Sequence, residues 1–195
     1  MVRDELIERQ NLDFEEWAIT PSPEAITPQS VKREQKEQEF KRQIGENSDI
    51  IITHTDADGL TSPALIEVAF GAQAAVASVS YQGPFTLHDA LVILAEEDIS
   101  DRNVFILDLN PDNTSMTLLV EELIDSGCVV MWFDHHQWDD LTYEAYNIPG
   151  VEIHIDEDEC TASLIYETYE DVFDEEMEEL AEVTKDRDLW INEDP

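Results

Sequence analysis

From Asp49 onward, short apolar runs of strand length alternate with longer amphipathic segments of helix length. The runs expected to be strands are residues 50–52, 75–81, 104–107, 129–133 and 151–155. The segments expected to be helices are residues 60–70, 86–96, 113–126, 160–172 and 174–183. Strands this apolar cannot face water on either side, which is typical of a parallel sheet covered by helices. The pattern therefore predicts an α/β fold with a mostly parallel sheet and helices on both faces.

The sequence pattern changes at about residue 48, from a polar, charged stretch to alternating apolar and amphipathic segments. Its 195 residues are enough for one domain with a substantial core. We assign residues 49–195 to that domain and residues 1–48 to a charged helical N-terminal extension, whose helix is expected from about residue 28 to 44. Half of the 10 basic residues of the chain lie in this helix, namely Lys32, Arg33, Lys36, Lys41 and Arg42. They could contact a phosphate backbone or a partner, but the acidic residues between them favour a solvated helix face.

The composition is strongly acidic, with 47 Asp and Glu against 10 Lys and Arg and a formal net charge of −37. In dilute salt such self-repulsion destabilises a compact state, so we expect adaptation to concentrated salt, which screens charge over about 3 Å at 1 M. High salt also weakens counterion release, so the charge does not exclude a nucleic-acid substrate. The longest apolar run, residues 129–133, is far too short to span a bilayer, and no signal-peptide pattern is present. These features predict a cytoplasmic protein with no membrane partner.

Candidate ligands follow the carboxyl ends of three expected strands. They are His54, Asp56 and Asp58 after the first strand, Asp108 after the third, and Asp134, His135 and His136 after the fourth. Because ligands of parallel sheets bind beyond the carboxyl ends of the strands, all three groups are expected at one edge. Asp-x-Asp triplets arise freely in an acidic chain. An Asp followed by two histidines, in a chain with only 5 His, is the specific signal.

Carboxylate oxygens and imidazole nitrogens without a thiolate suit Mn(II) or Mg(II), with Zn(II) and Fe(II) as alternatives and Ca(II) disfavoured by the histidines. Two such ions about 3.5–4 Å apart activate a water and neutralise a phosphoryl group. Alternate residues leaving a strand point the same way, so His54, Asp56 and Asp58 can face one cavity. Gly59 then lets the chain turn into a helix whose first N–H groups, up to Ser62, are a natural place for a substrate phosphate.

The order of these motifs resembles the DHH phosphoesterase family, which includes RecJ-type single-strand exonucleases, oligoribonuclease/pAp phosphatases, cyclic-dinucleotide phosphodiesterases and class II inorganic pyrophosphatases. The resemblance rests on four motifs: His-x-Asp-x-Asp-Gly at 54–59, Leu-Asp-Leu-Asn at 107–110, Asp-His-His at 134–136 and Lys-Asp-Arg-Asp at 185–188. It covers residues 49 to about 190 and implies the fold predicted above.

By this resemblance the site would hold two ions, Mn(II) first and Mg(II) as the alternative. Asp56 would bind one ion, Asp58 and His135 would bind the other, and Asp108 would bridge both. Asp108 and His135, together with His136, are the expected catalytic residues.

The resemblance also implies roles around the ions. His136 would contact the substrate phosphate or assist at the metal, and Asp134 would orient the histidine pair. In the fourth motif Asp186 is the preferred ligand and Asp188 its substitute. His54 lies two residues before the first Asp of its motif, as in archaeal RecJ-like proteins, whereas pyrophosphatases place their His four residues before it. Whether His54 is a ligand therefore stays open.

The implied function is hydrolysis of phosphodiester or phosphomonoester bonds of single-stranded nucleic acid or nucleotides, by a RecJ-like exonuclease or an oligonucleotide/pAp phosphatase. The alternative is a non-catalytic DHH module that binds nucleic acid or scaffolds a replication or repair complex. Intact motifs favour the enzyme. A smaller DHH-associated domain usually follows in the family, so we expect a chain that is a fragment, or that works alone or with a separate partner. Trp132, Trp138 and Trp190 flank the motifs, with core packing favoured over stacking on a base.

Overall fold

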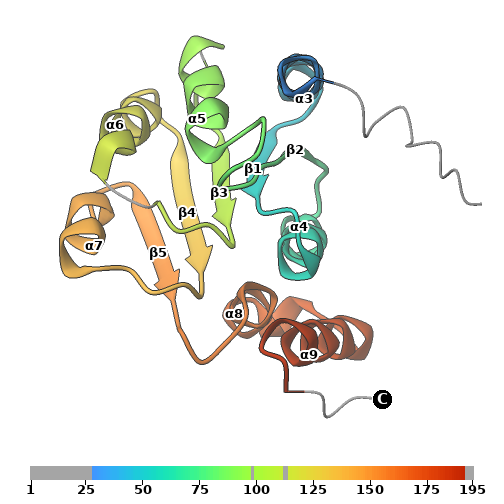
Figure 1. Ribbon diagram of the computed structural model, residues 1–195. Helices are drawn as coiled ribbons and strands as arrows, with labels where there is room; N and C mark the ends of the chain where they lie inside the picture. The colour runs from blue at the N-terminus through green and yellow to red at the C-terminus, as the bar shows by residue number, and fades with distance from the viewer. Residues whose placement is uncertain (1–27, 98, 112–113, 192–195) are drawn as a thin grey trace, which may run out of the picture.

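The protein is described by a computed structural model in which residues 28–97, 99–111 and 114–191 are placed (Figure 1). The strands are β1 Asp49–Thr53, β2 Ala74–Ser78, β3 Asn103–Leu107, β4 Val129–Asp134 and β5 Val151–Ile155. The α-helices are α3 Gln29–Glu46, α4 Ala57–Phe70, α5 Leu87–Glu96, α6 Thr117–Asp125, α7 Asp140–Tyr146, α8 Thr161–Thr168 and α9 Glu175–Asp188. Short 3-10 turns are Thr114–Met116 and Glu170–Val172.

The strands form one parallel sheet in the order β2-β1-β3-β4-β5, which confirms the predicted α/β class. Two helices are shorter than expected, because 3-10 turns take up residues at the start of the segment 113–126 and at the end of the segment 160–172. Helix α7 was not expected from the sequence. It is a short helix that begins at Asp140 and is capped by Asp139, whose side chain accepts a hydrogen bond from Thr142 N.

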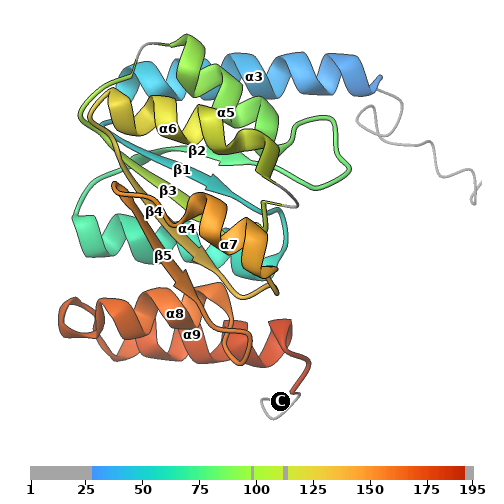
Figure 2. The same cartoon turned by 90° about the vertical axis from the view of Figure 1, so that its left-hand side faces the viewer.

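Both faces of the sheet are covered, as Figure 2 shows. Alternate strand residues point to opposite faces, so Ile50 and Ile52 join one core cluster while Ile51 joins the other. The first cluster includes side chains of α3, α5 and α6, and the second includes side chains of α4 and α8. The three central strands β1, β3 and β4 are thus buried on both sides, whereas the edge strand β5 is only partly buried.

Helix α3 packs on the domain rather than standing apart from it. Phe40 and Ile44, one turn apart, are buried in the first core cluster. Along the edge strand β2, Lys36 Nζ donates to Ser78 O at 2.7 Å, and Gln43 Oε1 accepts from Val76 N at 2.8 Å. These side chains cover backbone groups that an edge strand otherwise leaves open. The remainder of the extension, residues 1–27, lies outside the described residues.

The basic residues of α3 pair mainly with carboxylates of the protein itself. Arg33 contacts Glu37 and Asp89, Lys41 contacts Glu96 and Glu97, and Arg42 contacts Glu39 and Glu46. These pairs are largely exposed and contribute little stability each. They support the interpretation of this segment as a helix face and not as a nucleic-acid contact.

Strand order also marks the functional edge of the sheet. β2 lies on one side of β1 and β3 on the other, so the chain direction across the sheet reverses between β1 and β3. In open parallel sheets the crevice beyond the carboxyl ends at such a reversal is where ligands bind. Among the described residues, no helix combines the length and apolarity needed to cross a bilayer.

Candidate functional site

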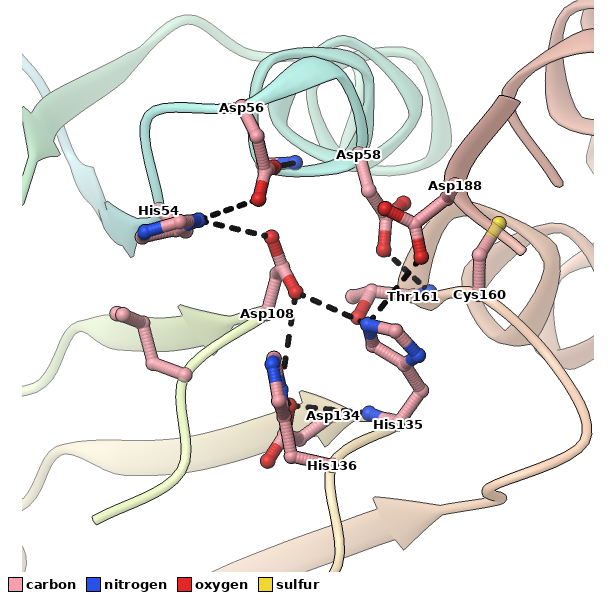
Figure 3. A network of polar contacts seen from close by, with 12 residues as sticks. His54, Asp56, Asp58, Asp108, Asp134, His135, His136, Cys160, Thr161 and Asp188 are labelled. Atoms are coloured by element: carbon pink, nitrogen blue, oxygen red, sulfur yellow. Dashed lines mark hydrogen bonds and ion pairs between the residues drawn. The ribbon is translucent and has the colours of Figure 1, made fainter. Parts of the chain in front are cut away.

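The carboxyl ends of β1, β3 and β4 lie side by side at this edge. Thr53 pairs with Leu107, and Leu107 pairs with Phe133, so the residues that follow these three lie at the same level of the sheet edge. These next residues are His54, Asp108 and Asp134. Figure 3 shows their side chains converging with those of Asp56, Asp58, His135, His136 and Asp188. We call this group the donor cluster.

Asp108 lies at the centre of the donor cluster. Its φ of 56° is in the left-handed region, which Asp tolerates better than most residues. The residue is 1% exposed, with Oδ1 3.3 Å from His135 Nε2 and Oδ2 3.7 Å from His54 Nδ1. Within the described residues, Oδ2 has no hydrogen-bond partner. A carboxylate oxygen that is this buried and lacks a donor is suited to a cation.

Asp56 and His54 form the side of the donor cluster at the start of α4. Asp56 caps this helix, because its Oδ1 accepts a hydrogen bond from Gly59 N at 2.9 Å, while its Oδ2 contacts His54 Nδ1. Burial raises the pKa of Asp56, but the Gly59 hydrogen bond and the contacts with Asp108 and His54 outweigh it, and the net shift of the pKa is downward. Asp56 is therefore readily ionised.

Asp58 joins the donor cluster to the start of α8. Its Oδ2 accepts from Thr161 N at 2.7 Å, and its Oδ1 accepts from Ala162 N at 2.8 Å. Burial raises the pKa of Asp58, and the nearby Asp188 carboxylate raises it further. The two backbone hydrogen bonds lower it, but the net shift of the pKa is upward. The N–H groups at a helix start thus hold this carboxylate in one orientation beside His135.

The fourth motif reaches the donor cluster through Asp188 and not through Asp186. Asp188 Oδ2 lies 3.4 Å from His135 Nε2. Asp186 is in none of the possible metal-binding groups found among the described residues. Residues two apart in an α-helix point about 200° apart, so α9 turns only one of the two carboxylates toward the cluster. The geometry therefore brings Asp188, the substitute named from the sequence, to the donor cluster, and which of the two acids is the ligand stays a prediction.

Asp134 lies beneath the two histidines, as expected for a residue that orients them. Its Oδ1 accepts hydrogen bonds from His135 N at 3.0 Å and contacts His136 Nδ1 at 2.7 Å, and its Oδ2 accepts from Trp138 Nε1 at 2.6 Å. The hydrogen bond to Asp134 raises the pKa of His136, although burial opposes the rise. His136 consequently carries more positive charge near neutral pH than a free imidazole.

Gly59 and Ser62, expected to bind substrate phosphate, occupy structural positions. A Cβ at Gly59 would lie 2.5 Å from His54 O, so only glycine fits against that backbone. Gly59 N donates to Asp56 Oδ1, and Leu60 N donates to Asp56 O. Ser62 is fully buried, and its hydroxyl donates to Asp58 Oδ1 at 3.4 Å. Gly59 N and Leu60 N are thus bonded to Asp56, and the expected contact of Gly59 and Ser62 with a substrate phosphate stays a prediction.

Repulsion among the carboxylates is concentrated on Asp108. Burial, followed by the neighbouring Asp58 and Asp56 carboxylates, raises the pKa of Asp108 to about 10. Burial also raises the pKa of Asp188. Without a cation the cluster therefore keeps a proton on Asp108 at neutral pH.

The donor atoms fit divalent cations. Three groups have ligand atoms within 4.8 Å of one another: His54, Asp56 and Asp108; Asp58, His135 and Asp188; and Asp108, His135 and His136. Asp108 belongs to the first and third of these groups, and the bridging role that the resemblance implies for it stays a prediction. Hard oxygen donors mixed with imidazole suit Mn(II) or Mg(II). The orphaned Asp108 Oδ2 and the raised pKa of this carboxyl supply the reason for a cation to bind.

A pocket of about 740 Å³ opens beside His136. It is lined by Tyr81, Asn110, His136, Gln137, Trp138 and Asp139. The Tyr81 ring is 5.4 Å from the His54 ring and 6.0 Å from the His136 ring, centre to centre. Tyr81 is 38% exposed, so this aromatic side chain meets solvent next to the donor cluster. We call this feature the Tyr81 pocket.

Sequence reasoning missed Tyr81 and Thr161 as neighbours of the site. Tyr81 was placed at the end of an expected strand, but β2 ends at Ser78 and Tyr81 lies in the loop that follows. Thr161 follows the cap of α8, which is Cys160, whose Sγ accepts from Ser163 N at 3.4 Å. Trp132 is buried in the core as expected, whereas Trp190 is 81% exposed.

Comparisons with known proteins agree with this architecture. Residues 49–187 match the family model described as the DHH family, N-terminal domain. An uncharacterized protein from Helicobacter pylori G27 is similar in structure, with 17% identity and a TM-score of 0.56, and so is CDC45 from Entamoeba histolytica, with 13% identity and a TM-score of 0.55. The matches cover 75% and 83% of this chain but 45% and 34% of those chains, so this chain spans less than half of either. No curated protein matches it in sequence.

The first prediction concerns Asp108 in the metal-free protein. Because its folded pKa of about 10 exceeds its ordinary value, this carboxyl binds more protons folded than unfolded, and stability is lost as pH rises from about 4 toward 10. We expect Asp108→Asn to raise Tm by about 5 °C or more at about pH 8, with a smaller gain at about pH 5, since 1 kcal/mol shifts Tm by about 2–4 °C. Melting in molar KCl with chelator measures this. A variant that melts at or below wild type at the higher pH contradicts the assignment.

The second prediction separates the two acids of the fourth motif. Removing a ligand carboxylate weakens a cation site, whereas removing an acid on the other face of α9 does not. We expect Asp188→Asn to weaken Mn(II) binding by about 10-fold or more and Asp186→Asn to change it by less than about 3-fold. Titration calorimetry of each folded variant gives the affinities. Because Asp186 is buried, its variant can lose stability, so only Mn(II) affinity decides, and the reverse order of the two variants would restore Asp186 as ligand.

Proposed function

Because the chain belongs to the DHH family, we propose that it is a metal-dependent phosphoesterase that hydrolyses phosphoester bonds of single-stranded nucleic acid or nucleotides. The donor cluster carries this proposal. Asp108 is buried between two groups of donors, its Oδ2 lacks a partner among the described residues, and its pKa is raised to about 10. A scaffold protein gains nothing from so costly an arrangement, which supports an enzyme over a non-catalytic module.

The residues divide the work of hydrolysis between them. Divalent cations, when bound, lower the pKa of a water and neutralise phosphoryl charge. Asp108 would release its proton to solvent when cations bind, and Asp108, Asp58 and His135 would be among the residues that hold them. His136, with its raised pKa, faces the Tyr81 pocket and supplies a positive donor for a phosphoryl oxygen. Asp134 fixes the ring of His136 through Nδ1 and leaves Nε2 for the substrate.

The Tyr81 pocket supports a nucleotide as the substrate. Its volume of about 740 Å³ accommodates a base and sugar, and the exposed ring of Tyr81 offers a face for stacking. Trp138 lines the same pocket and is anchored by its hydrogen bond to Asp134. A small inorganic phosphate would use neither aromatic side chain. RecJ-like cleavage of single strands is the first choice and dephosphorylation of pAp-type nucleotides the second.

Hydrolysis itself is the third prediction. In molar KCl with Mn(II), we expect release of nucleotide or phosphate from single-stranded DNA, short RNA or pAp, with little turnover of pyrophosphate. Asp108→Ala should lower the rate by about 10³-fold or more, because it removes the group joining both sides of the cluster. If wild type binds Mn(II) yet both proteins are equally inert on every substrate, the chain is a non-catalytic DHH module, and binding to single strands or to a replication or repair complex becomes the proposal to pursue.

The fourth prediction tests the Tyr81 pocket. Two substrates are compared, a short oligodeoxyadenylate and the same oligomer made of abasic residues. Loss of stacking in Tyr81→Leu should lower the preference in kcat/KM for the base-bearing oligomer by about 10-fold, or about 1.4 kcal/mol, whereas Tyr81→Phe keeps the ring and should keep the preference within about 2-fold. An unchanged preference in the Leu variant would remove the base from this pocket.

A further inference from the structure

Thr161 places a buried hydroxyl without a partner next to the donor cluster. It is the first residue of α8 and is 0% exposed. Its backbone N–H donates to Asp58 Oδ2, but its Oγ1 has no hydrogen-bond partner among the residues that the structure describes. Figure 3 shows the side chain extending between Asp58 and His135, on the inner side of the cluster.

Helix geometry does not explain this hydroxyl. Cys160 is the cap of α8, so Thr161 has no capping role. Other helical threonines bond back to the preceding turn, as Thr168 Oγ1 does to Leu164 O at 2.7 Å and Thr184 Oγ1 does to Leu180 O at 2.8 Å. A buried hydroxyl left unbonded costs about 1–3 kcal/mol, whereas valine has the same shape without that cost. The hydroxyl is therefore explained best by a ligand that occupies the cluster.

The position of Thr161 selects the kind of ligand. The substrate approaches from the open side, where His136 is 39% exposed and the Tyr81 pocket begins. Thr161 lies on the closed side, next to the buried residues Asp58 and Asp108. In an in-line displacement the attacking water and the leaving group occupy opposite sides of phosphorus. With the leaving group directed to the open side, a group on the closed side would meet the attacking water.

We propose that Thr161 is a further catalytic residue, whose hydroxyl forms a hydrogen bond with the attacking water and orients it toward phosphorus. This inference rests on the proposed function. In the reaction the water oxygen bonds to phosphorus, the ester bond between phosphorus and the leaving oxygen breaks, and the proton released by the water is balanced by protonation of the leaving group. The bonds of Thr161 itself do not change.

Two variants test this role, Thr161→Val, which removes the hydroxyl at constant shape, and Thr161→Ser, which keeps it. We expect the Val variant to lower kcat by about 10- to 100-fold with KM and Mn(II) affinity within about 3-fold of wild type, and the Ser variant to recover most of kcat. The metal-free Val variant should melt at or above wild type, because it loses an unbonded polar group. A hydroxyl that merely supports the fold would instead make the Val variant less stable.

Each other outcome overturns the proposal in a recognisable way. If kcat of the Val variant stays within about 2-fold of wild type, or the Ser variant is as slow as the Val variant, the hydroxyl does not orient the water. If Mn(II) affinity falls together with kcat, or the metal-free Val variant melts below wild type, Thr161 maintains the cluster and does not act in the reaction. Wild type that hydrolyses none of the substrates overturns the proposed function, and this role with it.

Discussion

Repulsion between closely spaced carboxylates, two of them buried, is the constraint on which the rest of the site depends. The level ends of β1 and β3 bring Asp56, Asp58 and Asp108 together, and α9 adds Asp188. The structure relieves this repulsion locally, with helix N–H groups on Asp56 and Asp58 and with a proton on Asp108. Asp108 Oδ2 remains without a partner among the described residues, so a bound cation would complete what the chain leaves unfinished.

The same hydrogen bonds that relieve Asp58 position the rest of that face of the protein. Because Asp58 holds the first N–H groups of α8, this helix is oriented against α4. Helix α9 then packs on both, and the hydroxyls of Thr61 and Thr184 lie at hydrogen-bond distance, 3.2 Å apart. Asp188 reaches His135 through this packing, although it lies far from the sheet edge in sequence. The carboxylate of the fourth motif is thus placed by helix packing, whereas the side chains of the first three motifs are placed by strand register.

This difference determines how much the sequence could predict. Alternating apolar runs specify the parallel sheet, and strand ends specify the edge where His54, Asp108 and Asp134 meet, because both follow from local pattern. The choice between Asp186 and Asp188 depends on the rotation of α9 about its axis, which no local pattern gives. Thr161 was equally hidden, since only the orientation of α8 shows that its hydroxyl lacks a partner. Helix α3 packs on the sheet through Phe40, which is buried. This burial was not evident from the sequence, because the segment around Phe40 is highly charged.

The acidic composition also bears on which positive groups could bind a phosphate, a role that arginine and lysine fill in many proteins. Arg102 donates to Ile44 O and Asn47 O, and Lys185 pairs with Glu159, so these cations are committed to the fold. Under the proposed function, a phosphate approaching a chain of net charge −37 would therefore depend on bound metal and on His136, whose pKa is raised by Asp134. The negative charge of the carboxylates would repel a phosphate from the site without cations. The same negative charge attracts the cations that would hold the phosphate, so cation binding would both neutralise the carboxylates and attract the substrate.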